Sequence, residues 1–202
     1  VAFWPLRQRY PRVLEEPQAW DFAFTPDGAK LLVASPERLL SRSLDPENAS
    51  EPRVLLRGLA SFPSIALDSI GRNVVAPARN GNIAVAATSG EPPREIGGFS
   101  QDSLATAVAI SPDGRRAASA SFVSPAQEKT IKVWDTESGA LERELPLPRA
   151  GELEQGGIIN LFFVDGDRLL ASGVSGLMLF DLRDGSRKDL LESLVACFAP
   201  ST

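Results

Sequence analysis

The sequence predicts an all-β fold built from a repeated unit of four short antiparallel strands. Short runs of Val, Ile, Leu and Phe alternate with Gly, Pro, Asp and Ser along the chain, which is the pattern of strands and turns. A Pro-Arg pair followed by apolar residues recurs at Pro11, Pro52 and Pro93, with a constant spacing of 41 residues. Looser copies contain Arg143 and Arg187. Such a fixed period indicates a repeat architecture.

A second element recurs in phase with the first and ends in glycine. Phe24 to Gly28 matches Ile110 to Gly114, with Leu67 to Gly71 between them, so the glycines are 43 residues apart in both steps. A shortened copy runs from Phe163 to Gly166, and Phe198 to Thr202 resembles the beginning of another. Two different elements in phase are not expected by chance, so the repeat organises nearly the whole chain.

The third unit shows what each repeat contains. We expect strands at Thr106 to Ile110, Arg116 to Ser121, Thr130 to Trp134 and Leu141 to Leu145, separated by turn residues. Four strands in about 40–45 residues is the period of a propeller blade. The sequence therefore predicts a β-propeller of four-stranded antiparallel blades, with about four whole blades and partial strands at both ends.

We expect residues 1–202 to form a single propeller segment. Val1 to Leu6 and Arg12 to Leu14 are predicted to be the third and fourth strands of an incomplete unit. Because position 1 is not methionine, we expect a fragment of a larger propeller, and a closed five-bladed ring is the alternative. The predicted units are 1–17 (partial), 18–61, 62–102, 103–156, 157–193 and 194–202 (partial).

Two residue types are expected to pack inside this fold. Small residues recur in the predicted second strands, where we expect them to fit around a crowded central channel. Tryptophans lie in the strand patterns, so packing in the core or between blades is favoured over a ligand-stacking role. The small residues are Ala34, Ala76, Ala117, Ala118 and Ala171, and the tryptophans are Trp4, Trp20 and Trp134.

The third unit resembles a WD repeat. Ser111-Pro112-Asp113-Gly114 is followed by Ala118 to Ser121, then by Thr130 to Asp135, which ends in Trp-Asp, and then by Ser138-Gly139. An aspartate that opens a tight turn and a glycine that closes it explain the spacing of four residues between Asp135 and Gly139. The fourth unit repeats this spacing. The expected structural residues of the turns are Asp27, Gly28, Asp113, Gly114, Trp134, Asp135, Gly139, Asp181 and Gly185.

One departure from the WD-repeat pattern is the absence of histidine from the whole sequence. WD repeats commonly carry a Gly-His pair whose imidazole connects the strands of a blade by hydrogen bonds. We therefore expect apolar packing between sheets to replace that polar network.

Composition and charge limit the possible partners. The net charge of −5 and the pI of about 4.9 argue against a nucleic-acid-binding surface. The longest apolar run, Ile158 to Val164, is too short to span a membrane. The single cysteine, Cys197, cannot form an internal disulfide, which fits a reducing compartment. We expect a cytoplasmic protein, with the periplasm as the alternative.

No catalytic residue, cofactor or metal site is predicted. Without histidine, neither a Ser-His-Asp triad nor a histidine-based zinc site can form, and no phosphate-binding loop motif occurs. Cys197 lies in an apolar, strand-like context and is expected in the core. Turn chemistry accounts for the neighbouring carboxylates of Asp165 and Asp167 and of Asp181 to Asp184 better than a calcium site does. Gly97-Gly98 and Gly156-Gly157 are expected in turns.

The positive functional signal is added length in the third unit. From Gly114 to Gly166 the step is 52 residues, with the extra residues at Phe122 to Lys129 and Pro148 to Gly157. Both segments are expected on the same face of adjacent blades, and clustered insertions often mark a binding face, although tolerated surface insertion also explains them. The candidate partner-binding residues are Phe122, Gln127, Glu128, Lys129, Arg149, Glu152, Glu154 and Gln155.

These observations favour a non-catalytic scaffold that presents loops of one face to a protein or peptide, within a larger signalling protein. The alternative is a propeller enzyme, or a propeller that binds a metal or small molecule, such as a lactonase-like or periplasmic one, whose site lies in further blades.

Overall fold

The structure is a computed structural model of the 202-residue chain. It describes residues 2–3, 12–13, 18–45, 51–61, 63–99, 105–121, 130–147, 158–173 and 176–191. Within these ranges the chain forms strands joined by turns and short connections. None of the described residues belongs to a helix that is long and apolar enough to cross a membrane.

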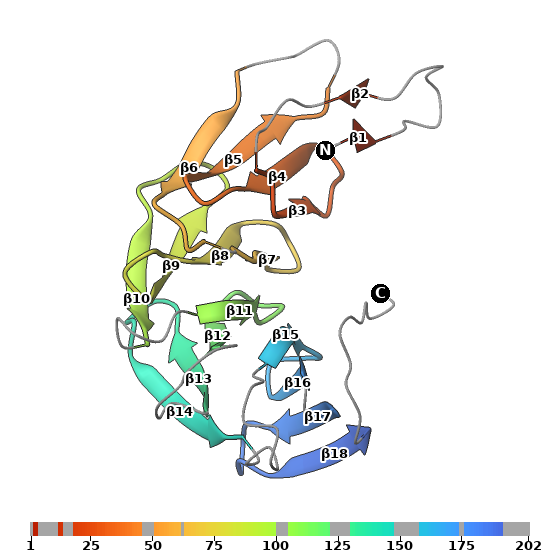
Figure 1. Cartoon of the computed structure of the whole chain (residues 1–202), viewed down its shortest axis with the longest axis vertical. Coiled ribbons are helices and arrows are strands. Elements are labelled where there is room, and N and C mark those ends of the chain that lie inside the picture. The colour runs from red at the N-terminus through yellow and green to blue at the C-terminus, as the bar shows by residue number, and fades with distance from the viewer. Residues whose placement is uncertain are drawn as a thin grey trace.

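The described strands form four antiparallel sheets of four strands each, which follow one another in an arc (Figure 1). We call these sheets blades 1 to 4. Blade 1 contains β3 (Asp21–Phe24), β4 (Lys30–Ala34), β5 (Arg38–Ser43) and β6 (Arg53–Arg57). Blade 2 contains β7 (Ala66–Leu67), β8 (Asn73–Pro77), β9 (Asn82–Ala87) and β10 (Arg94–Gly98).

The other two blades have longer strands. Blade 3 contains β11 (Ala105–Ile110), β12 (Arg116–Ser121), β13 (Thr130–Asp135) and β14 (Leu141–Pro146). Blade 4 contains β15 (Ile158–Phe163), β16 (Arg168–Gly173), β17 (Gly176–Asp181) and β18 (Arg187–Leu191). A two-stranded sheet of β1 (Ala2–Phe3) and β2 (Arg12–Val13) lies beside blade 1.

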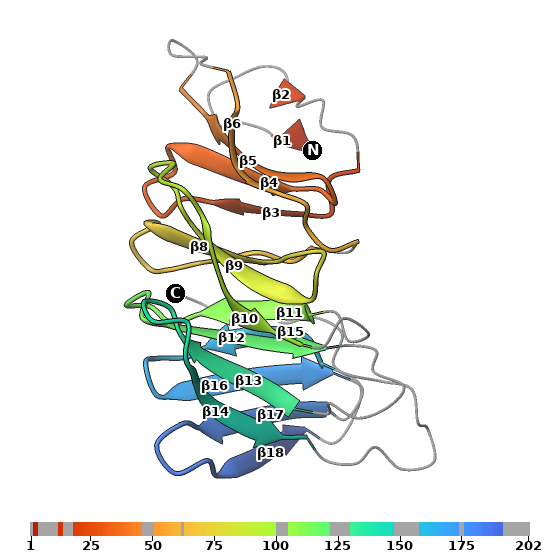
Figure 2. The same cartoon turned by 90° about the vertical axis from the view of Figure 1, so that its left-hand side faces the viewer.

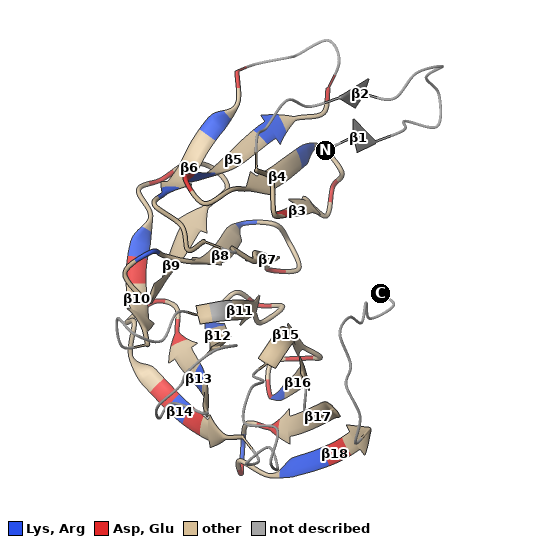
Figure 3. Ribbon diagram, in the orientation of Figure 1, with Lys and Arg blue, Asp and Glu red and all other residues tan. Residues whose placement is uncertain are grey.

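Strand order in every blade follows the chain, as in an up-and-down sheet. In each blade the first strand lies on the concave side of the arc and the fourth strand on the convex side (Figure 1). The blades stack face to face (Figure 2). Lys, Arg, Asp and Glu gather on the convex strands β6, β10, β14 and β18 (Figure 3). This architecture confirms the predicted all-β propeller of four-stranded blades.

An apolar core lies in each of the three seams between neighbouring blades. Because side chains alternate along a strand, each blade contributes one face to each neighbouring seam. Leu32 of β4 packs with Val74 of β8 between blades 1 and 2. Between blades 2 and 3, Ile83 packs with Trp134. Between blades 3 and 4, Ile131 is in the core that contains Phe180.

The five alanines noted in the sequence are fully buried, but the expected reason was wrong. They lie in the second strands β4, β8, β12 and β16 and belong to the seam cores rather than to a channel. Small side chains there let facing sheets approach closely while larger residues of the neighbouring strands fill the remaining space. These residues are Ala34, Ala76, Ala117, Ala118 and Ala171, each 0% exposed.

The tryptophans divide between two environments. Trp134 is 7% exposed and packs in the seam between blades 2 and 3, as expected. The same expectation was wrong for Trp20, which is 56% exposed just before β3. Phe22 and Phe24 follow it at alternate positions and are exposed as well, their rings in an edge-to-face arrangement with centroids 6.4 Å apart. Trp4 lies outside the described residues.

Gly97 and Gly98 were expected in a turn, but they lie in β10 at a shift of register against β9. Gly97 has a φ of +134°, and a Cβ there would lie 2.5 Å from a ring carbon of Trp134. The glycine therefore gives the indole of the next blade room to pack. Gly156, Gly157 and Cys197 lie outside the described residues.

Candidate functional site

One edge of the blade stack consists of short turns with a repeated hydrogen-bond pattern. In blade 1 the Thr25 hydroxyl donates to Oδ1 of Asp27 over 2.5 Å and accepts from the amide of Lys30. In blade 3 Ser111 and Asp113 make the corresponding bond over 2.6 Å. These bonds lower the pKa of both aspartates. Each turn is closed by a glycine in the left-handed region, Gly28 (φ +67°) and Gly114 (φ +74°).

The same edge carries the turns between the third and fourth strands. The amide of Gly139 donates to the carbonyl of Asp135 over 3.0 Å, and the amide of Gly185 donates to that of Asp181 over 2.9 Å. Oδ1 of Asp135 accepts from both the amide and the hydroxyl of Ser138, which lowers the pKa of its carboxyl. Hydrogen bonds from Arg183 lower the pKa of Asp181 to about 2. The aspartates therefore shape the turns.

Two carboxylates near these turns have comparable tasks. Asp165 accepts from the amides of Asp167 and Arg168. Asp68, which is buried, accepts from the amides of Arg72 and Asn73 and occupies the place of the hydroxyl residues in the neighbouring blades. Asp68 was not singled out from the sequence, although its fixed spacing from Gly71 was visible. No group of three or more Cys, Asp or Glu among the described residues could hold a metal ion.

The opposite edge of the stack carries the two long connections of blade 3. The first connection leaves β12 at Ser121 and enters β13 at Thr130. The second follows Leu147, the last described residue after β14, and enters β15 at Ile158. Antiparallel order places these four anchor residues at one edge. The eight predicted partner-binding residues lie between the anchors and outside the described residues: Phe122, Gln127, Glu128, Lys129, Arg149, Glu152, Glu154 and Gln155.

The recurring arginine of the repeat connects each blade to the next. Arg53 of β6 donates to the carbonyls of Ser89 and Gly90 in blade 2. Arg94 of β10 donates to the carbonyl of Glu137 in blade 3 over 2.7 Å. All three acceptor carbonyls lie in the turn between the third and fourth strands of the following blade. The arginine therefore has a structural task that explains its constant position in the repeat.

Blade 3 repeats the arrangement, and we call Arg53, Arg94 and Arg143 the bridging arginines. Arg143 of β14 donates to the carbonyl of Arg183 in blade 4 over 3.2 Å. The equivalent residue of blade 4, Arg187, instead pairs with Asp189 of its own strand over 2.9 Å. Apolar packing was expected to hold the blades together, and the bridging arginines add a polar connection that the sequence did not reveal.

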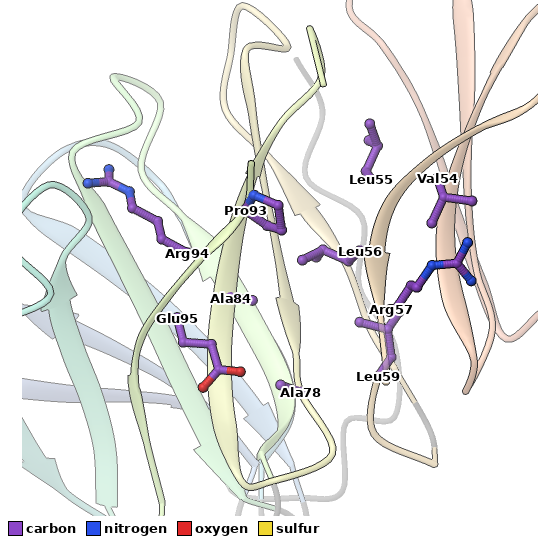
Figure 4. A pocket seen from close by; sticks show the side chains of 10 residues that line it. All are labelled: Val54, Leu55, Leu56, Arg57, Leu59, Ala78, Ala84, Pro93, Arg94 and Glu95. Carbon is purple, nitrogen blue, oxygen red and sulfur yellow. The ribbon is translucent and has the colours of Figure 1, made fainter. Parts of the chain in front are cut away.

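A groove opens on the convex side between blades 1 and 2, where the seam is incompletely filled. Its volume is about 530 Å³. Leu55, Leu56 and Leu59 from the end of blade 1 face Ala84 and Pro93 of blade 2 across it (Figure 4). The remaining lining residues are Val54, Arg57, Ala78, Arg94 and Glu95.

Comparison with solved structures places this arrangement among known folds. The chain is similar to the structure of U3-55K (TM-score 0.66, 16% identity, 88% of this chain and 53% of that chain). It is also similar to the WD40 repeats of RRP9 (TM-score 0.67, 16% identity, 89% of this chain and 53% of that chain). The chain has the fold of a WD-repeat β-propeller.

This WD-repeat fold covers about half the length of the structures that it matches. A third similar structure is the hydrazine synthase of Kuenenia stuttgartiensis (TM-score 0.64, 16% identity, 96% of this chain and 54% of that chain). At such identities the similarity concerns the fold. No protein-family model matches the sequence, and no curated protein matches it.

The WD-repeat blade 3 keeps a polar pair despite the missing histidine. Nε1 of Trp134 donates to the hydroxyl of Ser119 over 3.0 Å in the buried seam. The histidine-based network cannot form in this chain, and the Trp134–Ser119 pair is a polar contact that the sequence analysis did not predict. In blade 4 the corresponding pair is apolar, because Phe180 and Ala171 occupy these positions.

Proposed function

We propose that the protein is a non-catalytic interaction scaffold that uses one edge of its propeller to bind a protein or peptide. The observation that carries the proposal is the position of the two long connections of blade 3. Both begin and end at the edge opposite the short turns, at Ser121, Thr130, Leu147 and Ile158. Long connections held by rigid strands are where binding residues commonly lie.

The rest of the fold suits a rigid support for these connections. Three buried seam cores and the bridging arginines hold neighbouring blades together. The turn edge uses its aspartates and hydroxyls in internal hydrogen bonds. The similar WD40 structures support a scaffold in general, and we extend it to binding at this edge, within a larger signalling protein.

A comparison of two quadruple variants tests this function. The first changes Phe122, Lys129, Glu152 and Glu154 to alanine. The matched control changes four exposed residues of the turn edge to alanine, chosen because their side chains take no part in the turn hydrogen bonds described above. They are Ile70, Ser89, Arg115 and Glu137. Proteins captured from an extract of the source cells are quantified for the wild-type chain and both variants, together with the melting temperature of each.

We expect the first variant to lose the captured proteins, and the control to keep them, at melting temperatures within about 2 °C of the wild type, because exposed substitutions usually change stability little. Undiminished capture by the first variant, or an equal loss in the control, would refute binding at the edge of the long connections.

A further inference from the structure

We propose that the groove between blades 1 and 2 is a second docking site, for a partner segment that carries a basic side chain next to a large apolar one. This site lies between blades 1 and 2, whereas the two long connections belong to blade 3 and to its junction with blade 4; one end of the groove, at Leu59 and Ala78, reaches the same edge as those connections. It therefore stands apart from the function proposed above, and each can fail without the other.

The reason for the groove emerges when the three seams are compared. We compare the residue of the third strand that pairs with the second residue of the second strand in each blade. This residue is Trp134 in β13 and Phe180 in β17, and both side chains are buried between blades. In β9 the same position is Ala86. The blade 1–2 seam thus lacks the aromatic ring that fills each of the other two.

A second residue is missing from the same seam. Two positions before the aromatic residue, β13 has Lys132 and β17 has Met178, and each reaches across its seam. Nζ of Lys132 lies 4.7 Å from the centre of the Phe99 ring of blade 2. At this position β9 has Ala84. Alanines therefore replace the long side chains of the other seams at both positions, and one of them, Ala84, lines the groove.

The wall that blade 1 contributes to this volume is rich in leucine, and the charged lining residues are Arg57, Arg94 and Glu95. Leu55 and Leu56 come from β6, and Leu59 follows it, so blade 1 provides a floor of leucine side chains. Pro93 forms the opposite wall in Figure 4. Burial of a large apolar side chain against such a surface is favourable by about 25 cal/mol per Å². A partner's aromatic or long aliphatic residue fits this requirement.

The charge beside the groove selects a basic neighbour for that residue. Glu95 lies opposite Ala84 in the β9–β10 pair, just as Glu144 lies opposite Lys132 in blade 3. Nζ of Lys132 is 3.9 Å from the Glu144 carboxylate. The carboxylate of Glu95 accepts only from the side-chain amides of Asn80 and Asn82 among the described residues. Blade 2 thus has the acidic residue of this pair, Glu95, but has Ala84 in place of the lysine.

The two arginines that line the groove do not oppose this choice. Arg94 donates to the carbonyl of Glu137 in blade 3. In Figure 4 the side chain of Arg57 lies on the far side of β6 from Leu56. Hydrogen bonds from the two asparagines lower the pKa of Glu95, so it remains ionised at neutral pH. The net charge of −5 also favours a basic partner.

Two tripeptides with blocked ends serve as probes. Acetyl-Lys-Val-Trp-amide copies residues 132–134, which fill the neighbouring seam, and acetyl-Glu-Val-Trp-amide reverses the charge. Each is titrated into the whole chain, and the NMR signals of the Val54, Leu55, Leu56 and Leu59 methyl groups are followed. We expect saturable shifts with the lysine peptide and about fivefold weaker binding of the glutamate peptide, which corresponds to one exposed ion pair.

Two variants separate the apolar and the charged parts of the site. Ala84→Met with Ala86→Phe installs the pair of blade 4, and we expect it to abolish the methyl shifts. Glu95→Gln keeps the shape and should bind both peptides equally, and it tests the site even where the filled variant does not fold. The absence of saturable shifts in the wild type, equal binding of both peptides by the wild type, or undiminished binding by the folded filled variant would overturn the proposal.

Discussion

The buried pair of Trp134 and Ser119 allows a quantitative test of how the seams are stabilised. Blade 4 has Phe and Ala at these two positions, so the chain itself supplies an apolar replacement. We consider Trp134→Phe, Ser119→Ala and the double variant. The single changes each break the 3.0 Å hydrogen bond between Nε1 and the hydroxyl, whereas the double change removes both of its partners.

The expected magnitudes follow from burial. Ser119 is 0% exposed, so Ser119→Ala leaves the indole N–H buried without an acceptor, which costs about 1–3 kcal/mol. Trp134→Phe loses the hydrogen bond and leaves a small cavity, at a cost of about 2–3 kcal/mol. In the double variant no polar group is orphaned. Its loss should therefore be about 1 kcal/mol smaller than the sum of the two single losses.

Urea unfolding followed by circular dichroism measures these differences, because the signal does not depend on Trp134. The comparison requires equal m-values, which indicate that the variants unfold in the same way. Additivity of the two single effects within about 0.3 kcal/mol would show that the hydrogen bond does not couple the two residues, and would refute the reasoning.

Three further predictions concern the bridging arginines, the glycines and acid stability. Arg143→Ala should lower the free energy of unfolding by about 1 kcal/mol, because it removes a hydrogen bond between blades. Arg187→Ala should lower it by less than about 0.5 kcal/mol, because the Arg187 ion pair is exposed and stays within one strand. Equal effects of the two variants in urea unfolding would contradict a role of Arg143 between blades. Gly97→Ala should cost about 2 kcal/mol more than Gly28→Ala, since both have positive φ but only the first places its Cβ against Trp134. Because the pKa of Asp181 is lowered from 3.8 to about 2, its stabilising effect is complete above the usual value and is lost as the pH falls through about 2. Asp181→Asn should make the melting temperature depend less on pH between 3.8 and about 2. An unchanged pH dependence would argue against a stabilising effect of the ionised Asp181.

The strands of blade 3 show what could be predicted from the sequence. The expected strand at Arg116 to Ser121 matches β12 in both bounds, and the third strand extends only to Asp135 beyond the expected Trp134. Alternating faces and Asp-Gly turns are local signals, so they specify strands and turns well. The positions of the aspartates in turns follow from the same local chemistry.

Contacts between blades could not be predicted, because both partners must be known. The repeated arginine was visible at Arg53 and Arg94, but its acceptors are backbone carbonyls that have no sequence signature. The groove was equally hidden, since Ala84 and Ala86 look like ordinary small strand residues. The eight candidate binding residues lie outside the described ranges, so they stay predictions, as does the cytoplasmic location.

The two alanines of the blade 1–2 seam also have a consequence for cooperativity. In a repeat array the interfaces between neighbours determine whether the units unfold together. Ala84 and Ala86 give this interface less side-chain volume than Trp134 or Phe180 gives the others. We therefore expect native-state hydrogen exchange to reveal β3 to β6 as a unit that opens before the remaining blades. A bound partner in the groove would then join the two cooperative units into one.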